Sequence, residues 1–97
     1  MANYSLSSQA QNDLAGIYKY GIKYFGQEQA TTYLLEMEEF MLELSSRQEL
    51  SRDASKISTS LKFYNFKAYV IFYLQDGPEE IHVLRVLGKR MNFVEHI

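Results

Sequence analysis

The sequence predicts an α+β fold: a short N-terminal strand and an antiparallel helical hairpin packed on a twisted antiparallel β-sheet, in the order β-α-α-β-β-β, with a short C-terminal tail. Residues 8–25 and 27–46 repeat apolar residues every three or four positions, whereas residues 61–87 hold short apolar runs separated by turn residues. A single glycine, Gly26, separates the two helical segments. The length suits one modest core, so residues 1–97 are expected to form a single domain.

The first two elements are a short strand and a helix. Tyr4 and Leu6 lie two positions apart, which is typical of a strand with one apolar face. Ser8–Gln11 fits the S-x-x-Q capping box, in which a hydroxyl and an amide satisfy backbone donors at a helix start, and Ser7 is an equally good cap. The inward stripe of this helix is expected to comprise Ala10, Leu14, Ile17, Tyr18, Gly21 and Phe25.

The second helix is predicted at Gln27–Ser46. Because Gly26 is a tight break, the two helices must fold back as a hairpin whose shared apolar face covers the sheet. The stretch Ser45–Ser60 has few apolar residues, which predicts a connection with at most a helical turn at Glu49–Lys56. The apolar stripe of the second helix comprises Ala30, Tyr33, Leu34, Met37, Phe40, Met41 and Leu44.

The centre of the sheet is predicted at Tyr69–Leu74, a run of apolar and aromatic residues that suits a strand covered on both faces. Leu61–Phe66 and Ile81–Leu87 are expected to be its antiparallel neighbours. The Asp-Gly step within Gln75–Glu80 tolerates the left-handed backbone of a tight hairpin. The remaining residues, Gly88–Ile97, are expected to form a tail with one amphipathic turn.

Composition argues against several classes of function. Neither His82 nor His96 has partners at metal-ligand spacing and the chain has no Cys, so no metal or other cofactor is expected, and His82 is expected to be a satisfied surface or edge residue. Phosphate-binding glycine loops and nucleophile elbows are absent. The net charge of −2 argues against direct nucleic-acid binding. With neither a signal peptide nor a membrane-spanning run in the sequence, a cytoplasmic protein without membrane contact is expected.

One group of residues around the end of the last strand has the chemistry of metal-free RNA cleavage, which needs a base, an acid and cations that bind phosphate. The alternative is a solvated basic end beside a poorly held terminus, and residue types alone favour it because catalysis requires held geometry. The group comprises Lys62, Tyr64, Arg85, Lys89, Arg90, Glu95 and His96.

Several strings share their order with a known family. The N-terminal half carries Tyr4-Ser5-Leu6-Ser7, Ala10, Asp13-Leu14, Ile17-Tyr18, Tyr20, Phe25-Gly26, Gln29-Ala30 and Tyr33. The middle strands carry Leu61-Lys62-Phe63 and Tyr69-Val70-Ile71-Phe72-Tyr73, and the end carries Val83-Leu84-Arg85-Val86-Leu87 and Met91. This ordered set resembles the ParE toxins of the ParE/RelE superfamily of type II toxin–antitoxin systems. Their closing string RVLHxxMD differs here at Gly88 and Asn92.

The resemblance implies a toxin that inhibits DNA gyrase and so replication, without a catalytic site of its own. It also implies a ParD-like antitoxin that neutralises the toxin in a hetero-oligomer, by burying apolar residues in a groove between the hairpin and the sheet. Toxicity and gyrase contact are assigned by the resemblance to Arg85, Lys89, Arg90 and Met91.

Two alternatives share this fold. One is a RelE-like ribosome-dependent mRNA endonuclease, which Gly88-Lys89-Arg90 and His96 indicate. The other is a degenerate, non-toxic homologue that only binds an antitoxin, which Gly88 and Asn92 indicate. The gyrase inhibitor is favoured over both because of the ordered resemblance, although the fold alone does not separate them.

Overall fold

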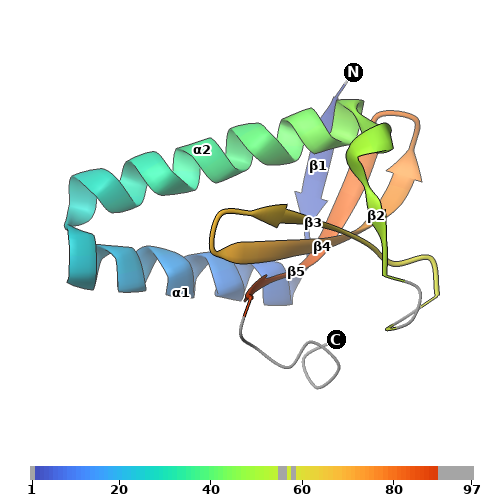
Figure 1. Ribbon diagram of the computed structural model, residues 1–97. Helices are drawn as coiled ribbons and strands as arrows, with labels where there is room; N and C mark the ends of the chain where they lie inside the picture. The colour runs from blue at the N-terminus through green and yellow to red at the C-terminus, as the bar shows by residue number, and fades with distance from the viewer. Residues whose placement is uncertain (1, 55–56, 58, 90–97) are drawn as a thin grey trace.

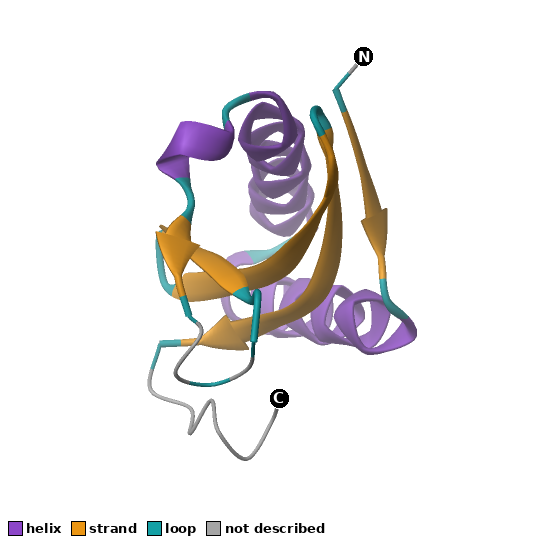
Figure 2. Cartoon of the chain, turned by 90° about the vertical axis from the view of Figure 1, so that its right-hand side faces the viewer, coloured by secondary structure: helices purple, strands orange, loops and turns teal. Residues whose placement is uncertain are grey.

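The computed structural model describes residues 2–54, 57 and 59–89. Figures 1 and 2 show two layers, a helical hairpin and a twisted sheet, so the predicted α+β architecture is confirmed. The elements in chain order are β1 (Asn3–Leu6), α1 (Ser8–Phe25), α2 (Gln27–Ser46), the 3-10 turn η1 (Gln48–Leu50), β2 (Arg52–Asp53), β3 (Lys62–Phe66), β4 (Tyr69–Gly77) and β5 (Glu80–Gly88).

The sheet is mixed rather than wholly antiparallel. Its strand order is β1-β5-β4-β3-β2, so β4 is central, as its apolar run predicted. Strands β3, β4 and β5 are joined by hairpins and pair antiparallel, whereas β1 runs parallel to β5 with Tyr4 opposite Ile81. A parallel neighbour requires a long crossover, and the rest of the chain between β1 and β5 supplies it. The prediction of an antiparallel sheet is therefore wrong for this one pair.

The start of α1 is fixed to the sheet by Ser7. The Ser7 hydroxyl accepts a hydrogen bond from the Ala10 N–H at 2.9 Å and donates one to the Leu84 carbonyl at 2.6 Å. Ser7 is thus the N-cap, and the capping box predicted at Ser8–Gln11 is wrong by one residue. The second bond explains the choice, because it holds the Ser7 hydroxyl to β5 as well as to the helix start.

The hairpin turns at Gly26, whose φ of 90° favours glycine. Nearby, a Cβ added to Gly21 would lie 2.9 Å from the Ala30 Cβ, so the close approach of α1 and α2 requires a glycine at this position. Phe25 was predicted to face inward but is 62% exposed. The reason is that the hairpin extends past the β3–β4 turn, and its end has no sheet beneath it (Figure 1).

The central strand β4 is buried on both faces, as predicted. One face carries Ile71 and Tyr73 toward the helices, and the other carries Val70 and Phe72. The helix-facing core also contains Ala10, Leu14, Met37, Met41, Leu44, Ile81, Val83 and Val86. The second core contains Ala54, Leu61 and Leu87. Ala54 and Leu61, which lie between β2 and β3 in the chain, therefore help to cover the face of the sheet that the helices leave open.

Two loop predictions are corrected. The helical turn expected at Glu49–Lys56 is the shorter η1, and it is followed by β2, which pairs with Lys62 and Phe63 of β3. The β4–β5 turn falls at Pro78-Glu79 rather than at Asp-Gly, since Gly77 pairs with Glu80 and does not adopt a positive φ. Within the described part of the chain, neither helix has the length and apolar character of a membrane span.

Candidate functional site

An open apolar groove lies between the far half of the helical hairpin and the β3–β4 turn. Its volume is about 420 Å³. A concave site with this largely apolar lining is the usual setting for a bound ligand or partner segment. The lining residues are Ile17, Tyr20, Gly21 and Phe25 of α1, Gln29, Ala30 and Tyr33 of α2, Ala68 of the β3–β4 turn, and Tyr69 at the start of β4.

Aromatic rings form the inner wall of this groove. The Tyr33 ring meets the rings of Phe66 and Tyr69 edge-on, with centroid distances of 5.9 Å and 6.2 Å. Burial raises the pKa of Tyr33, while the Ala68 backbone and the Lys67 cation oppose the rise. Burial also raises the pKa of Tyr69. Both hydroxyls therefore stay protonated at neutral pH, so the wall is uncharged.

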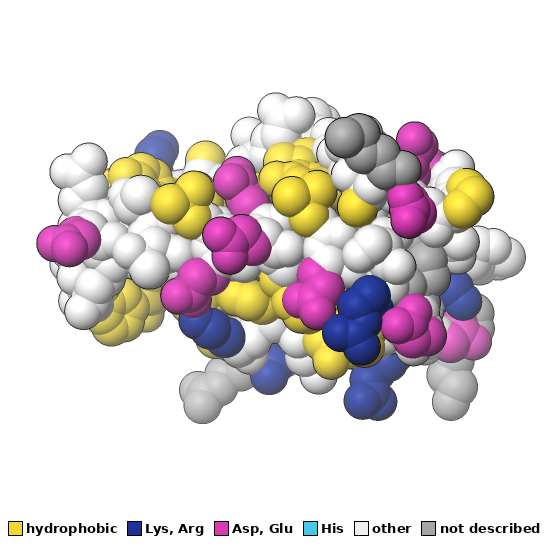
Figure 3. Space-filling model, turned by 90° about the horizontal axis from the view of Figure 1, so that it is seen from above, with side chains coloured by type: hydrophobic (Ala, Val, Ile, Leu, Met, Phe, Trp, Pro, Cys, Tyr) yellow, Lys and Arg dark blue, Asp and Glu magenta, His cyan; other side chains and the backbone are white. Residues whose placement is uncertain are grey.

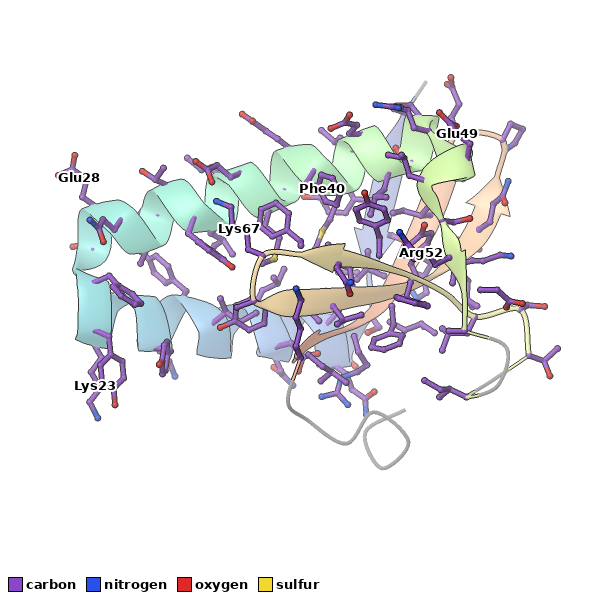
Figure 4. All side chains as sticks on the ribbon, viewed as in Figure 1. Lys23, Glu28, Phe40, Glu49, Arg52 and Lys67 are labelled. Atoms are coloured by element: carbon purple, nitrogen blue, oxygen red, sulfur yellow. The ribbon has the colours of Figure 1, made fainter. Side chains whose placement is uncertain are left out.

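Lys67 holds the sheet side of the groove to α2. It adopts a left-handed conformation in the β3–β4 turn, with φ of 52°, and its side chain reaches α2 (Figure 4). The ammonium lies 5.0 Å from the Tyr33 ring centroid and forms an ion pair with Glu36. Its hydrogen bond to Glu36 raises the pKa of Lys67. These contacts join the β3–β4 turn to α2 beside the groove.

The helix side of the groove is exposed. Tyr20 is 54% exposed, and the centroid of its ring lies 4.5 Å from the centroid of the Tyr24 ring. Together with Phe25 these rings make the end of the hairpin apolar, and contiguous apolar surface of this kind marks interaction sites. The face of the molecule seen from above α2, by contrast, carries several acidic side chains among apolar and other ones (Figure 3). Leu35 of α2 is 54% exposed.

Arg85, which the resemblance assigned to toxicity, is engaged by α1. Its Nε and Nη2 donate to the Asp13 carboxylate at 2.8 Å and 2.9 Å, and the Val86 N–H donates to the same carboxylate at 3.0 Å. Both charged side chains are only 14% exposed. The hydrogen bond that Arg85 donates to Asp13 raises the pKa of Arg85. Arg85 therefore ties β5 to α1. Asp13 is among the residues that carry the family resemblance, but the sequence did not predict its pairing with Arg85, although it is the one acid in α1.

Lys89 lies where the chain leaves the sheet beside the groove. It is exposed, and its N–H donates to the Ala68 carbonyl at 3.2 Å. The preceding Gly88 pairs with Tyr69, so the end of β5 is next to two lining residues. The other two residues assigned to toxicity, Arg90 and Met91, lie outside the described residues, as do Glu95 and His96.

The residues considered for RNA cleavage are not assembled in the described part of the chain. Tyr64 and Lys62 lie on β3, which β4 separates from β5. The Tyr64 ring packs against Phe40 of α2 with centroids 5.3 Å apart, and Arg85 is held by Asp13.

The histidine prediction can be checked at one of the two positions. As predicted, His82 has a hydrogen-bond partner: its Nδ1 lies 2.7 Å from the Ser5 hydroxyl. It sits on an interior strand rather than an edge, because β1 covers β5 on that side. No group of three or more His, Cys, Asp and Glu suited to a metal ion occurs among the described residues.

Comparisons with known proteins agree on one family. Residues 4–93 match the family described as ParE toxin of type II toxin-antitoxin system, parDE. Toxin ParE of Escherichia coli is 25% identical over 97 residues, which cover 100% of this chain and 94% of that protein. A chain of the chromosomal ParDE TA system from P. aeruginosa shares the fold, with a TM-score of 0.74, 18% identity, and coverage of 91% of this chain and 96% of that chain. The chain therefore belongs to the ParE toxin family of type II toxin–antitoxin systems.

Proposed function

We propose that this protein inhibits DNA gyrase, and so replication, and that a ParD-like antitoxin neutralises it. The observation that carries the proposal is the match of residues 4–93 to the ParE toxin family. Its mode of action is binding rather than catalysis. The apolar groove supports this mode, because exposed rings and an uncharged wall suit a protein partner better than a small polar substrate.

The gyrase contact is proposed at Lys89 and the chain that follows it, Arg90 and Met91 included. Support comes from the exposure of Lys89 and from its position at the end of the last strand. Arg85 is proposed to act indirectly, by fixing β5 to α1 through Asp13. Substituting Arg85 is then expected to weaken the fold, whereas substituting Lys89 should weaken the gyrase contact alone.

The antitoxin is proposed to bind in the groove. A flexible segment that folds on binding gains free energy by burying apolar side chains, and the groove offers aromatic surface on both sides. Tyr20 and Phe25 are exposed in the free chain, so covering them removes apolar area from water. Together, the toxin and the antitoxin would form a hetero-oligomer.

Regulated expression in a bacterial host tests the proposed function. Growth arrest is expected, together with loss of negative supercoiling in a reporter plasmid, and co-expression of the matching antitoxin should restore both. Lys89→Glu is expected to relieve the arrest, and Lys19→Glu is the matched control because Lys19 is an exposed lysine of α1 that does not line the groove. Arrest with normal supercoiling and cleaved mRNA would instead indicate the ribosome-dependent endonuclease.

A further inference from the structure

The exposed side of α2 carries a pair of leucines that neither core cluster includes. Leu35 and Leu42 are 54% and 42% exposed, and neither of them lines the groove. Because they lie seven positions apart, they occupy the same side of the helix, about 10 Å apart along its axis. Single exposed leucines are ordinary, but two in equivalent heptad positions form a row against which the side chains of a second helix can pack.

Acidic side chains surround this leucine row. α2 contains five glutamates and no Lys or Arg, and the face seen from above α2 shows acids among apolar side chains (Figure 3). Glu36 pairs with Lys67, and Glu43 pairs with Arg47. The other three glutamates form no ion pair among the residues that the structure describes, and one of them, Glu39, is exposed and lies between the two leucines in sequence. Negative charge without a partner therefore lies beside the apolar row.

We propose that this side of α2 is a docking surface for a basic amphipathic helix of a protein partner. The apolar side chains of that helix pack against Leu35 and Leu42, and its Lys or Arg side chains lie beside Glu39 and the neighbouring acids. The charge disfavours other occupants. It repels nucleic acid and anionic lipid, and two copies of this chain that met through α2 would bring two rows of glutamates together. Because the surface is separate from the groove, the inference depends neither on gyrase inhibition nor on antitoxin binding.

A synthetic helix tests the docking surface. The probe is a fluorescein-labelled peptide of about three heptads, with leucine at positions a and d and lysine at e and g. A matched peptide carries glutamate in place of lysine. Binding of each peptide to the full chain is followed by fluorescence anisotropy at low and at high salt.

Two pairs of variants separate the apolar and the charged contributions. Leu35→Gln combined with Leu42→Gln removes the leucine row without changing the net charge. Its matched control is Ile22→Gln combined with Tyr24→Gln, because these are two exposed apolar residues of α1 that do not line the groove. Glu39→Lys reverses the charge between the leucines, and Asp76→Lys makes the same change of net charge at an exposed position of β4.

The lysine peptide is expected to bind at least about tenfold more tightly than the glutamate peptide, a difference of about 1.4 kcal/mol. The leucine double variant and Glu39→Lys should each weaken this binding by about tenfold, and added salt should weaken it as well. The α1 control should keep the wild-type affinity, and Asp76→Lys should lose less than Glu39→Lys.

Four results would overturn the proposal. The first is no binding of the lysine peptide, or equal affinity for the two peptides. The second is wild-type affinity in the leucine double variant, shown by circular dichroism to be folded. The third is loss of binding in Phe25→Ser but not in the leucine double variant, which would place the peptide in the groove. The last is a free protein that sediments as a dimer and becomes a monomer in the leucine double variant, because a second copy would then cover this side of α2.

Discussion

Replacing Asp13 by alanine separates a structural role of Arg85 from a role in gyrase contact. The Asp13 carboxylate accepts three hydrogen bonds, two from Arg85 and one from the Val86 N–H, and the two charged side chains are 14% exposed. Asp13→Ala leaves these donors without that acceptor in a largely desolvated place. Removing one partner of a buried pair lowers the free energy of unfolding by about 3–5 kcal/mol. Because both side chains keep some exposure, we expect a loss of about 3 kcal/mol here.

The assay is thermal unfolding followed by circular dichroism. A loss of about 3 kcal/mol lowers Tm by roughly 12–24 °C in a domain of this size. Asp76→Ala is the matched control, because it removes the same charge from an exposed position near the β4–β5 turn and should change stability by less than about 0.5 kcal/mol. The double variant Asp13→Leu with Arg85→Met should recover much of the loss, since it replaces both charges of the pair by apolar side chains in this desolvated place.

Two results would refute this reasoning. One is a Tm of Asp13→Ala that matches the control, which would mean that the pair adds nothing to the fold. The other is an unchanged Tm in Arg85→Ala combined with lost gyrase inhibition. That outcome would return Arg85 to the gyrase contact and leave the carboxylate with no structural importance.

Further predictions concern packing and pH. Gly21→Ala should lower stability by about 1–3 kcal/mol, because its Cβ would meet the Ala30 Cβ at 2.9 Å. Gly16→Ala should raise it by about 0.5–1 kcal/mol, because nothing lies within 4 Å of that position. Urea midpoints of Gly21→Ala and Gly16→Ala that shift in the same direction would contradict these two predictions. Tyr73→Phe should not destabilise the protein at pH 7, because the buried Tyr73 hydroxyl makes no hydrogen bond of good geometry among the described residues. Ser51 lies near enough to lower the pKa of Tyr73, but the effect of burial is larger. Burial raises the pKa of Tyr73 to about 12 from 10.0, so the folded state keeps a proton that the unfolded chain releases. The contribution of Tyr73 to the free energy of unfolding is complete below pH 10 and is lost as the pH rises toward 12. Tyr73→Phe should therefore remove this part of the loss of stability at alkaline pH. Parallel loss in the variant and the wild type would show that another group governs alkaline unfolding.

Local periodicity predicts much of this fold. The bounds of both helices agree with the sequence prediction. The helix break at Gly26 and the apolar stripes are local patterns, which depend on residues only a few positions apart in the sequence. The burial of β4 on both faces follows from its uninterrupted apolar run. The prediction that Phe25 is buried fails because its spacing fits the apolar stripe, whereas its burial depends on how far the hairpin extends beyond the sheet.

The remaining features depend on contacts between distant parts of the chain. The parallel pairing of β1 with β5 joins residues more than seventy positions apart, and no local pattern sets the direction of such a pair. Asp13 and Arg85 are 72 positions apart, so the sequence shows two ordinary charged residues where the structure has a tight ion pair. The groove was predicted between hairpin and sheet, but its residues, such as Ala68, become apparent only once the β3–β4 turn is placed beneath α2.

The measurement that tests the central claim most directly is plasmid supercoiling by purified DNA gyrase, with and without this protein in excess. Inhibition is predicted, with linear DNA appearing after protease treatment because the trapped gyrase holds broken strands. Supercoiling at the unperturbed rate, in the presence of protein shown by circular dichroism to be folded, would contradict the claim for that gyrase.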